Sequence, residues 1–421
     1  MDILLKHVKV IDRRSKHHNK KVDVLIQKGI ISKIGKSLKA PSKTKVWEKK
    51  NTHISIGWFD IGTQIGEPGF EQRETMDSIS RLAIKGGYTG IACFPNTNPT
   101  LDQQSNIAFI INRAKSQPID ILPIGAVSKG CEGKEIAEMV DMHHAGAIAF
   151  SDGEHPLYHS GILLRALEYA KGFDGLIIHK PGNKEIQATG VIHEGDTSIH
   201  LGMPGIPSIA ESLTVHRDCE ICGYAEGRLL IHSISAEDSL KEIKTYKRKG
   251  FHIDGTIPYL NLVHTDKQLN GFDANLKVLP PLRNESDRKA LVKAIASEDI
   301  TVITSNHQPL EPELKDKEFF YAPFGAIGLQ TSFAALNTIC GKDLDLEKMI
   351  HALSIGPRKA LGMETPQLEV GSEANLTLFD PKEKWTFTKD LNESNSVNSP
   401  FFGSTFVGKV QAIIHQNSLL Q

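Results

Sequence analysis

Residues 78–94 read SISRLAIKGGYTGIACF, a helical stretch followed directly by a strand-like run. The helical stretch covers 78–85, and the strand-like run, 88–94, is largely apolar. Apolar strands that alternate with helices are typical of a parallel sheet that is buried on both faces. This stretch therefore predicts one unit of an α/β fold.

The same alternation continues on both sides of this unit. Further strand-like runs lie at 54–59, 119–124, 147–150, 176–178, 228–231, 251–253 and 300–304. Helical stretches such as 163–171 and 239–247 lie between them. Because these runs and 88–94 make eight, we predict a (β/α)8, TIM-like barrel. Chemistry in that fold is found at the carboxyl ends of the strands, so those positions are the ones to inspect.

The two ends of the chain have a different character. Short strands are predicted at 3–11, 22–26 and 30–34, with a turn at Lys28-Gly29 between the last two. Strand-like runs return at 375–379 and from 404 onward. We expect both ends to form one small β-sandwich domain, made of 1–54 plus 366–421, beside a barrel that spans 55–365.

Composition excludes several classes of function. The 421 residues carry 49 Lys plus Arg and 50 Asp plus Glu, a net charge of −1, which argues against nucleic acid or a membrane surface as the main partner. No run approaches 18 apolar residues, and the start shows no signal-peptide pattern. The five cysteines are scattered, and Cys219 and Cys222 look like ordinary helix residues. We expect a cytoplasmic protein.

Several strings, taken together and in order, resemble one family. They are EPG (67–69), GGYTGI (86–91), PNTNP (95–99), AFSD (149–152), LGMPGIP (201–207), KVLPPLR (277–283), APFGAIGLQT (322–331) and ANLTLFDP (374–381). The chain resembles the dihydroorotases of the amidohydrolase superfamily, specifically the long-chain bacterial type. That resemblance implies a zinc-dependent barrel enzyme that interconverts N-carbamoyl-L-aspartate and dihydroorotate, with an aspartate that shuttles protons.

The first strand departs from the family pattern. Active members end this strand in Asp-x-His-x-His-x-Arg-Glu-Pro-Gly, where two histidines bind metal and the arginine holds substrate. This chain has DIGTQIGEPG at 60–69, so Gly62 and Gln64 replace the histidines and Gly66 replaces the arginine. Glycine has no side chain, and a neutral amide oxygen is a poor zinc ligand.

The other family positions are kept unevenly. Asp152, His179 and His232 fall in metal-ligand positions, although each also suits a strand-end turn or a hydrogen-bonded remnant. The shuttle string Asp-His-Ala-Pro-His has become NHQPL at 306–310, so Asn306 cannot take a proton at neutral pH and Leu310 replaces a histidine. Leu279 replaces an asparagine. Asn96 and His307 remain as remnants of the substrate pocket.

Three functions follow as hypotheses. The leading one is a non-catalytic homologue without metal or other cofactor, because Gly62, Gln64 and Asn306 remove ligands and proton shuttle together. Inactive relatives serve as structural partners of aspartate transcarbamoylase, so the resemblance implies such a partner or a homo-oligomer. The second is an active cyclic amidohydrolase with one zinc on Asp152, His179 and His232, helped by His307. The third is a protein that binds a small ligand in the old pocket.

Overall fold

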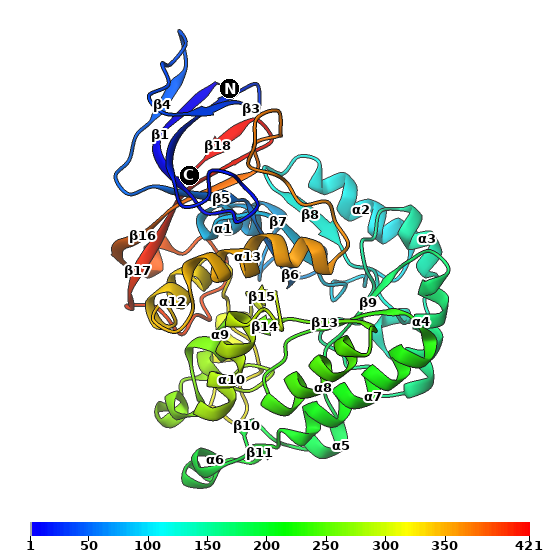
Figure 1. Cartoon of the computed structure of the whole chain (residues 1–421). Helices are drawn as coiled ribbons and strands as arrows, with labels where there is room; N and C mark the ends of the chain where they lie inside the picture. Colours follow the sequence, from blue (N-terminus) through cyan, green and yellow to red (C-terminus); the bar gives the residue numbers. More distant parts are fainter. Residues whose placement is uncertain (1) are drawn as a thin grey trace.

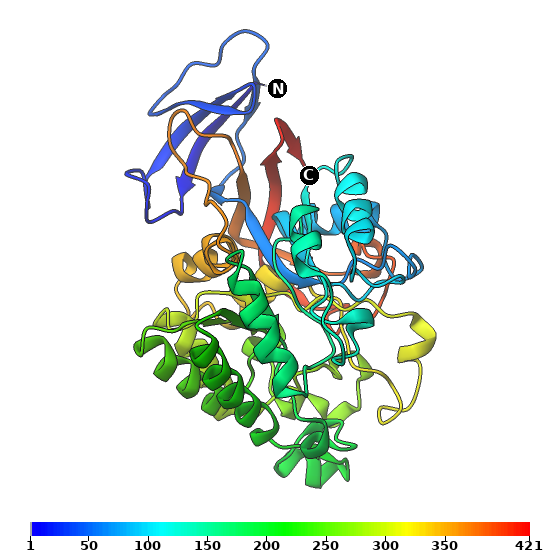
Figure 2. The ribbon, with the colours of Figure 1, turned by 90° about the vertical axis from the view of Figure 1, so that its right-hand side faces the viewer.

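The computed structural model describes residues 2–421, which form a β domain and a barrel (Figure 1). Both chain ends lie in the β domain, and the turned view in Figure 2 shows the same separation of the two parts. The barrel strands are β6 (Trp58–Thr63), β7 (Tyr88–Cys93), β8 (Asp120–Pro123), β9 (Leu176–His179), β12 (Arg228–Ile231), β13 (His252–Gly255), β14 (Ile257–Pro258) and β15 (Ile303–Thr304).

Parallel pairing runs through the barrel in sequence order. β6, β7 and β8 form one ladder, β9, β12 and β13 a second, and β14 and β15 a third. Phe150 bridges Gly125 and Ile177 and so joins the first ladder to the second. The circle closes between β15 and β6, where the Gln64 amide donates to the His307 carbonyl at 3.1 Å. The predicted barrel is thereby confirmed.

Some predicted strands differ in extent. The run at 147–150 contributes only the bridges at Phe150, and 300–304 is reduced to Ile303–Thr304. The run at 54–59 divides at Gly57, because β5 (His53–Ile56) pairs with strands of the β domain while β6 pairs with β7. An apolar run cannot reveal which sheet each of its halves joins, since both halves are buried.

Thirteen α-helices are described within residues 2–421. They are α1 (Met76–Gly86), α2 (Gln104–Ala114), α3 (Met139–His144), α4 (Ser160–Lys171), α5 (Lys184–Gln187), α6 (Asp196–Leu201), α7 (Ile209–Ala225), α8 (Glu237–Arg248), α9 (Tyr259–Val263), α10 (Glu285–Ala296), α11 (Pro312–Lys315), α12 (Ser332–Ile339) and α13 (Leu346–Ala360). Longer helices, such as α1 and α4, pack against the barrel strands. In α1, the Thr75 hydroxyl caps the first turn by accepting from the Ser78 amide, and Ile79, Leu82 and Ala83 are buried. The helix predicted at 78–85 is confirmed.

Both ends of the chain build one eight-stranded sheet. Its order is β18 (Ser418–Leu420), β17 (Thr405–His415), β16 (Leu376–Thr386), β5, β1 (Ile3–Val10), β2 (Lys21–Gln27) and β3 (Ile30–Gly35), with β4 (Lys45–Trp47) paired to β1. One apolar core, including Leu5, Val24, Ile54 and Leu378, unites the two ends. The contribution of both termini agrees with the sequence, whereas the sandwich arrangement stays a prediction.

The β domain lies against the end of the barrel where the strands begin. The Trp58 amide donates to the Thr377 hydroxyl at 3.2 Å, and the Arg358 guanidinium, on α13, donates to the Gly57 carbonyl at 2.6 Å. Across residues 2–421, no helix is long and apolar enough to cross a membrane. Cys219 and Cys222 lie in α7 as free, buried thiols.

Candidate functional site

The carboxyl ends of the barrel strands gather the positions that the sequence singled out. Gly62 lies in β6, His179 ends β9, and His232 directly follows β12. An ideal Cβ at Gly62 would lie 2.7 Å from the His232 ring, so these positions are neighbours in space. Gln64, Asn96, Asp152, Asn306 and His307 follow strands at the same end. We call this end the barrel mouth.

The first strand has no room for the side chains that the family pattern places there. At Gly62 the backbone φ is +84°, and an added Cβ would come within 2.7 Å of both Phe94 and His232. At Gly66, a Cβ would meet the Glu74 carbonyl at 2.4 Å. Real Cβ atoms do not approach other atoms this closely, so the packing as well as the sequence excludes a histidine and an arginine here.

Asp152 is committed to its own surroundings. One carboxylate oxygen accepts from the Val127 amide at 3.0 Å and the Ser128 amide at 2.9 Å, and the other accepts from the Ser128 hydroxyl. Burial raises the pKa of this carboxyl, against the opposing effect of these hydrogen bonds. Asp152 therefore fixes the loop that follows β8.

His179 also uses both ring nitrogens within the protein. Its Nε2 accepts from the Leu157 amide at 2.8 Å, and its Nδ1 lies 2.5 Å from the Asp218 carboxylate. Asp218 projects from α7 and is held by Arg217 at 2.6 Å. A histidine whose two nitrogens are both engaged has no lone pair left for a metal.

His232 keeps one free nitrogen. Its Nδ1 lies 3.1 Å from the Thr256 hydroxyl, while its Nε2 is buried without a hydrogen-bond partner among the described residues. The Phe94 ring meets it edge to face at 4.9 Å. Burial, and then the charge of Lys180, lower the pKa of His232 to about 3. The imidazole is therefore neutral at pH 7.

A lysine supplies the positive charge of the mouth. The Lys180 side chain is only 3% exposed, and its ammonium pairs with the Glu154 carboxylate. Lys180 directly follows His179 in the sequence, which by itself does not indicate a partner for it. Glu154 lies in the loop after Asp152, and nothing in its local pattern points to Lys180.

Asn96 and His307 serve structural contacts. The Asn96 side chain donates to the Asp152 carbonyl at 3.1 Å and accepts from the Glu154 amide at 3.1 Å, so it ties two loops together. His307 accepts from the Gly328 amide at 3.2 Å through Nδ1, and its Nε2 lies 3.6 Å from the fully buried Glu74 carboxylate. Asn96 is thus used in holding the two loops, whereas the His307 Nε2 has no hydrogen-bond partner among residues 2–421.

Asn306 is the residue that the family resemblance aligns with the shuttle aspartate. Its amide donates to the Leu279 carbonyl at 3.3 Å and accepts from Gln308 at 3.5 Å, with a backbone φ of +45°. The adjoining pocket is lined by Lys180, Gln187, Leu279, Pro280 and Arg283, among others, and has room for about one water molecule. A substrate the size of dihydroorotate does not fit this space.

The zinc that the resemblance implies does not fit the residues as they are arranged. No group of three or more His, Cys, Asp or Glu side chains within residues 2–421 is placed to hold a metal ion. Of the three candidate ligands, only His232 offers a free atom, and a cationic ammonium lies nearby. With His307, whose Nε2 also lacks a hydrogen-bond partner in this part of the chain, the site has two free nitrogens, which cannot replace the three protein ligands of a catalytic zinc site.

Comparisons with known proteins show which family the chain resembles. Residues 53–239 match the model for dihydro-orotase-like proteins, and residues 209–416 match that of the amidohydrolase family. The chain is 35% identical to a dihydroorotase of Citrifermentans bemidjiense, over 97% of both chains. It is 34% identical to a dihydroorotase of Syntrophus aciditrophicus, over 100% of this chain and 99% of the relative.

Solved structures show the same fold at lower identity. The L-hydantoinase of Arthrobacter aurescens superposes with a TM-score of 0.85 at 21% identity, over 99% of this chain and 95% of that one. The dihydropyrimidinase of Brevibacillus agri gives 0.83 at 21% identity, over 100% and 95%. Similarity at this level shows the fold alone, whereas the relatives at 34–35% identity show which family the chain belongs to. The chain therefore belongs to the dihydroorotase family of the amidohydrolases.

Proposed function

We propose that this chain is a non-catalytic dihydroorotase homologue that acts as a scaffold or regulatory partner in pyrimidine synthesis. The observation that carries the proposal is the state of His179. Its Nε2 accepts a backbone hydrogen bond from Leu157 and its Nδ1 is bonded to Asp218, so neither nitrogen is left for a metal. A histidine enclosed in this way by protein contacts favours a structural role for the whole barrel mouth.

The chemistry expected of such a mouth supports the same proposal. Hydrolysis of an amide in this family depends on a metal that polarises the carbonyl and activates water. Asn306 carries no titratable proton in the neutral range, so it cannot replace the shuttle aspartate. Enzymes lower barriers of this kind by at least about 8 kcal/mol. The two imidazole nitrogens left at the mouth without a hydrogen-bond partner among residues 2–421, on His232 and His307, cannot supply that much without a metal and a proton shuttle.

The partner comes from the family resemblance. Inactive relatives assemble with aspartate transcarbamoylase, the preceding enzyme of the pathway, and a retained barrel with a closed mouth suits the same use. The proposal accordingly places the chain in the cytoplasm, with either this partner or a second copy of itself.

One observation favours the alternative of an active dihydroorotase. Relatives that match nearly the whole chain at 34–35% identity bear that name. For activity, His179 would have to give up one of its two protein partners, the Leu157 amide or the Asp218 carboxylate, for a metal, and Lys180 would have to leave the mouth. The alternative thus requires a rearrangement at two buried positions.

Metal content and turnover distinguish the two functions. The protein is purified without chelator, analysed for zinc, and assayed in both directions with N-carbamoyl-L-aspartate and dihydroorotate, with and without added Zn²⁺. The dihydroorotase of Citrifermentans bemidjiense, purified in parallel, is the positive control. We expect zinc far below one per chain and no turnover above background. Stoichiometric zinc with metal-dependent turnover would contradict the proposal.

A second experiment addresses the partner alone. The chain is co-expressed with the aspartate transcarbamoylase chain of its own genome, and the product is analysed by size-exclusion chromatography with light scattering. We expect one complex that contains both chains. Separate elution of the two chains at micromolar concentration would remove the partner from the proposal, whatever the outcome of the activity assay.

A further inference from the structure

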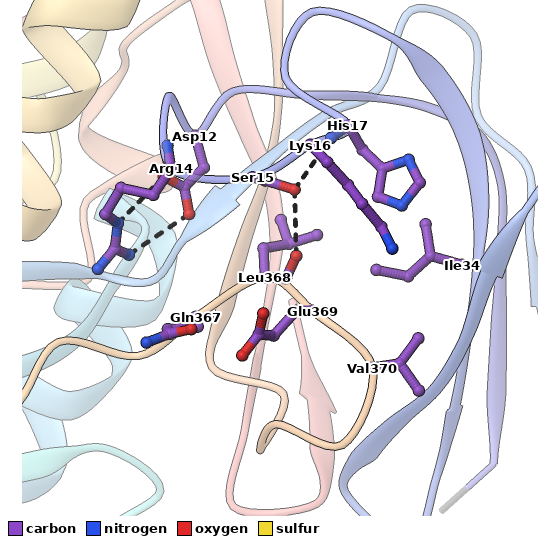
Figure 3. Close-up of a pocket in the computed structure, with 10 residues that line it drawn as sticks. All are labelled: Asp12, Arg14, Ser15, Lys16, His17, Ile34, Gln367, Leu368, Glu369 and Val370. Carbon is purple, nitrogen blue, oxygen red and sulfur yellow. Dashed lines mark hydrogen bonds and ion pairs between the residues drawn. The ribbon is translucent and has the colours of Figure 1, made fainter.

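A second polar region lies far from the mouth, at the edge of the β domain. The loop between β1 and β2 faces the segment 367–370 across a pocket of about 290 Å³ (Figure 3). Ile34 of β3 closes a third side. We call this space the junction pocket.

The walls of the junction pocket are joined by specific contacts. Arg14 donates to Asp12 at 3.2 Å, and across the gap to the Thr365 hydroxyl at 2.7 Å and the Pro366 carbonyl at 2.6 Å. The Ser15 hydroxyl donates to the Leu368 carbonyl at 3.2 Å. These bonds fix both segments, so the pocket is a built feature and not a gap between free loops.

Four polar side chains of the pocket take no part in these contacts. In the described part of the chain, Lys16, His17, Gln367 and Glu369 have no side-chain hydrogen bond or ion pair. Figure 3 shows Lys16 and His17 on one side of the pocket and Glu369 on the other. Opposite charges thus face one space without neutralising each other.

Apolar side chains complete the lining. Leu368 is buried beneath the pocket, Ile34 is half-buried, and Val370 is 58% exposed although it lies beside Leu368 and Glu369. A ligand with an apolar part would remove this surface from water, which is favourable in proportion to the area covered.

The chemistry of the lining narrows the class of ligand. Lys16 disfavours a metal cation, and Glu369 disfavours phosphate or another multivalent anion, since the Asp12 carboxylate and the Arg14 guanidinium already pair with each other. The volume is at the lower limit for pockets that bind small molecules, so a nucleotide is too large. What remains is a small molecule that carries one positive charge, one negative charge and an apolar group.

We propose that the junction pocket binds a free α-amino acid with an apolar side chain. Its carboxylate lies on the Lys16 ammonium and its ammonium on Glu369, with Ile34 and Val370 against the side chain. His17 adds a hydrogen bond to the carboxylate, and Gln367 accepts one from the ammonium. Burial and the nearby Lys16 and Lys20 lower the pKa of His17, so it contributes a neutral donor near pH 7. The site is independent of the proposed function of the mouth.

Isothermal titration of the full chain tests the site. The probes are leucine, isoleucine, valine and methionine, with N-acetyl-leucine and leucinamide as analogues that lack the ammonium and the carboxylate, respectively. We expect saturable binding of at least one of the four amino acids. Each analogue of leucine should bind at least about tenfold more weakly, the usual cost of losing one charge-assisted hydrogen bond.

Substitutions locate the binding. Lys16→Gln and Glu369→Gln should each lower the affinity for the amino acid by about tenfold or more. The matched surface variants, Lys39→Gln and Glu373→Gln, should leave this affinity unchanged. Absence of binding for all four amino acids at millimolar concentration would overturn the proposal. Binding that is unaffected by Lys16→Gln and Glu369→Gln would also overturn it, because the ligand would then occupy another place.

Discussion

The barrel mouth and the junction pocket contain the same three side-chain types, lysine, histidine and glutamate, in opposite states. At the mouth, Lys180 pairs with Glu154 and is 3% exposed, beside the buried His232. At the junction, Lys16, His17 and Glu369 line open space without partners among the described residues. Side-chain type therefore does not identify a binding site. The partners that tertiary packing supplies decide whether a polar group is structural or available to a ligand.

The largest effect is expected from breaking the ion pair at the mouth. Lys180→Met leaves the Glu154 carboxylate without its counter-ion, so the free energy of unfolding should fall by about 2–3 kcal/mol. Urea denaturation measures the change. The double variant Lys180→Met with Glu154→Gln should regain part of this loss, because the uncompensated charge is gone. Lys184→Met, an exposed control nearby, should change little. If Lys180→Met and Lys184→Met lower the free energy of unfolding equally, the buried ion pair contributes no more to stability than an exposed lysine.

A second variant tests how tightly the first strand is packed. Gly62→Ala should cost about 2–3 kcal/mol, since its Cβ would lie 2.7 Å from Phe94 and His232 at a φ of +84°. Gly202→Ala is the matched control, because Gly202 has a φ of +63° with nothing within 4 Å of an added Cβ. It should show only the backbone cost of about 1 kcal/mol. Equal losses in the two variants would indicate that space for a larger residue exists at the mouth.

The pH dependence of stability reports on His232. Its pKa is about 3 in the folded chain and 6.5 as a free side chain, so the unfolded state binds more protons between these values. The contribution of the neutral His232 imidazole to the free energy of unfolding is complete above pH 6.5 and is lost as the pH falls toward 3. His232→Gln should reduce the slope of unfolding free energy against pH by up to about 1.4 kcal/mol per unit in this range. A slope that His232→Gln leaves unchanged would contradict the burial of this imidazole.

The smallest effect is expected at the junction pocket. Lys16→Met and Glu369→Met should each alter the free energy of unfolding by no more than about 0.5 kcal/mol, because neither side chain holds the fold together. The same denaturation experiment as for Lys180→Met gives a direct comparison of two lysines. A loss near that of Lys180→Met would show that Lys16 is a structural residue, and the contrast between the two regions would fail.

The sequence predicted the barrel because its signal is repetitive. Each β–α unit, such as 78–94, repeats the pattern of a helical stretch beside an apolar run. Eight such repeats favour a closed barrel over other architectures. The site positions could be found for a related reason. Strand ends converge at the mouth in any such barrel, so the residues that follow the apolar runs, His179 and His232 included, had to lie near one another.

The contacts of those positions could not be read in the same way. Asp218 reaches His179 from α7, and the Leu157 amide approaches from a loop, so both partners depend on how distant segments pack. The same holds for Lys180 and Glu154, which are 26 positions apart in the chain. A buried acidic residue on the inner side of a helix, as Asp218 is in α7, was the one local signal that could have pointed to a partner.

The sequence by itself determined the barrel and the sheet shared by both chain ends, and it predicted that Gly62 and Gln64 stand in place of two family histidines. These features rest on local periodicity and on residue identity, which a linear chain carries in full. Only the tertiary structure decided that protein groups form hydrogen bonds with His179 and Asp152, and that the side chains of Lys16 and Glu369 have no partner among residues 2–421. Hydrogen bonding and burial depend on atoms brought together from distant segments, and no single segment of the chain contains that information.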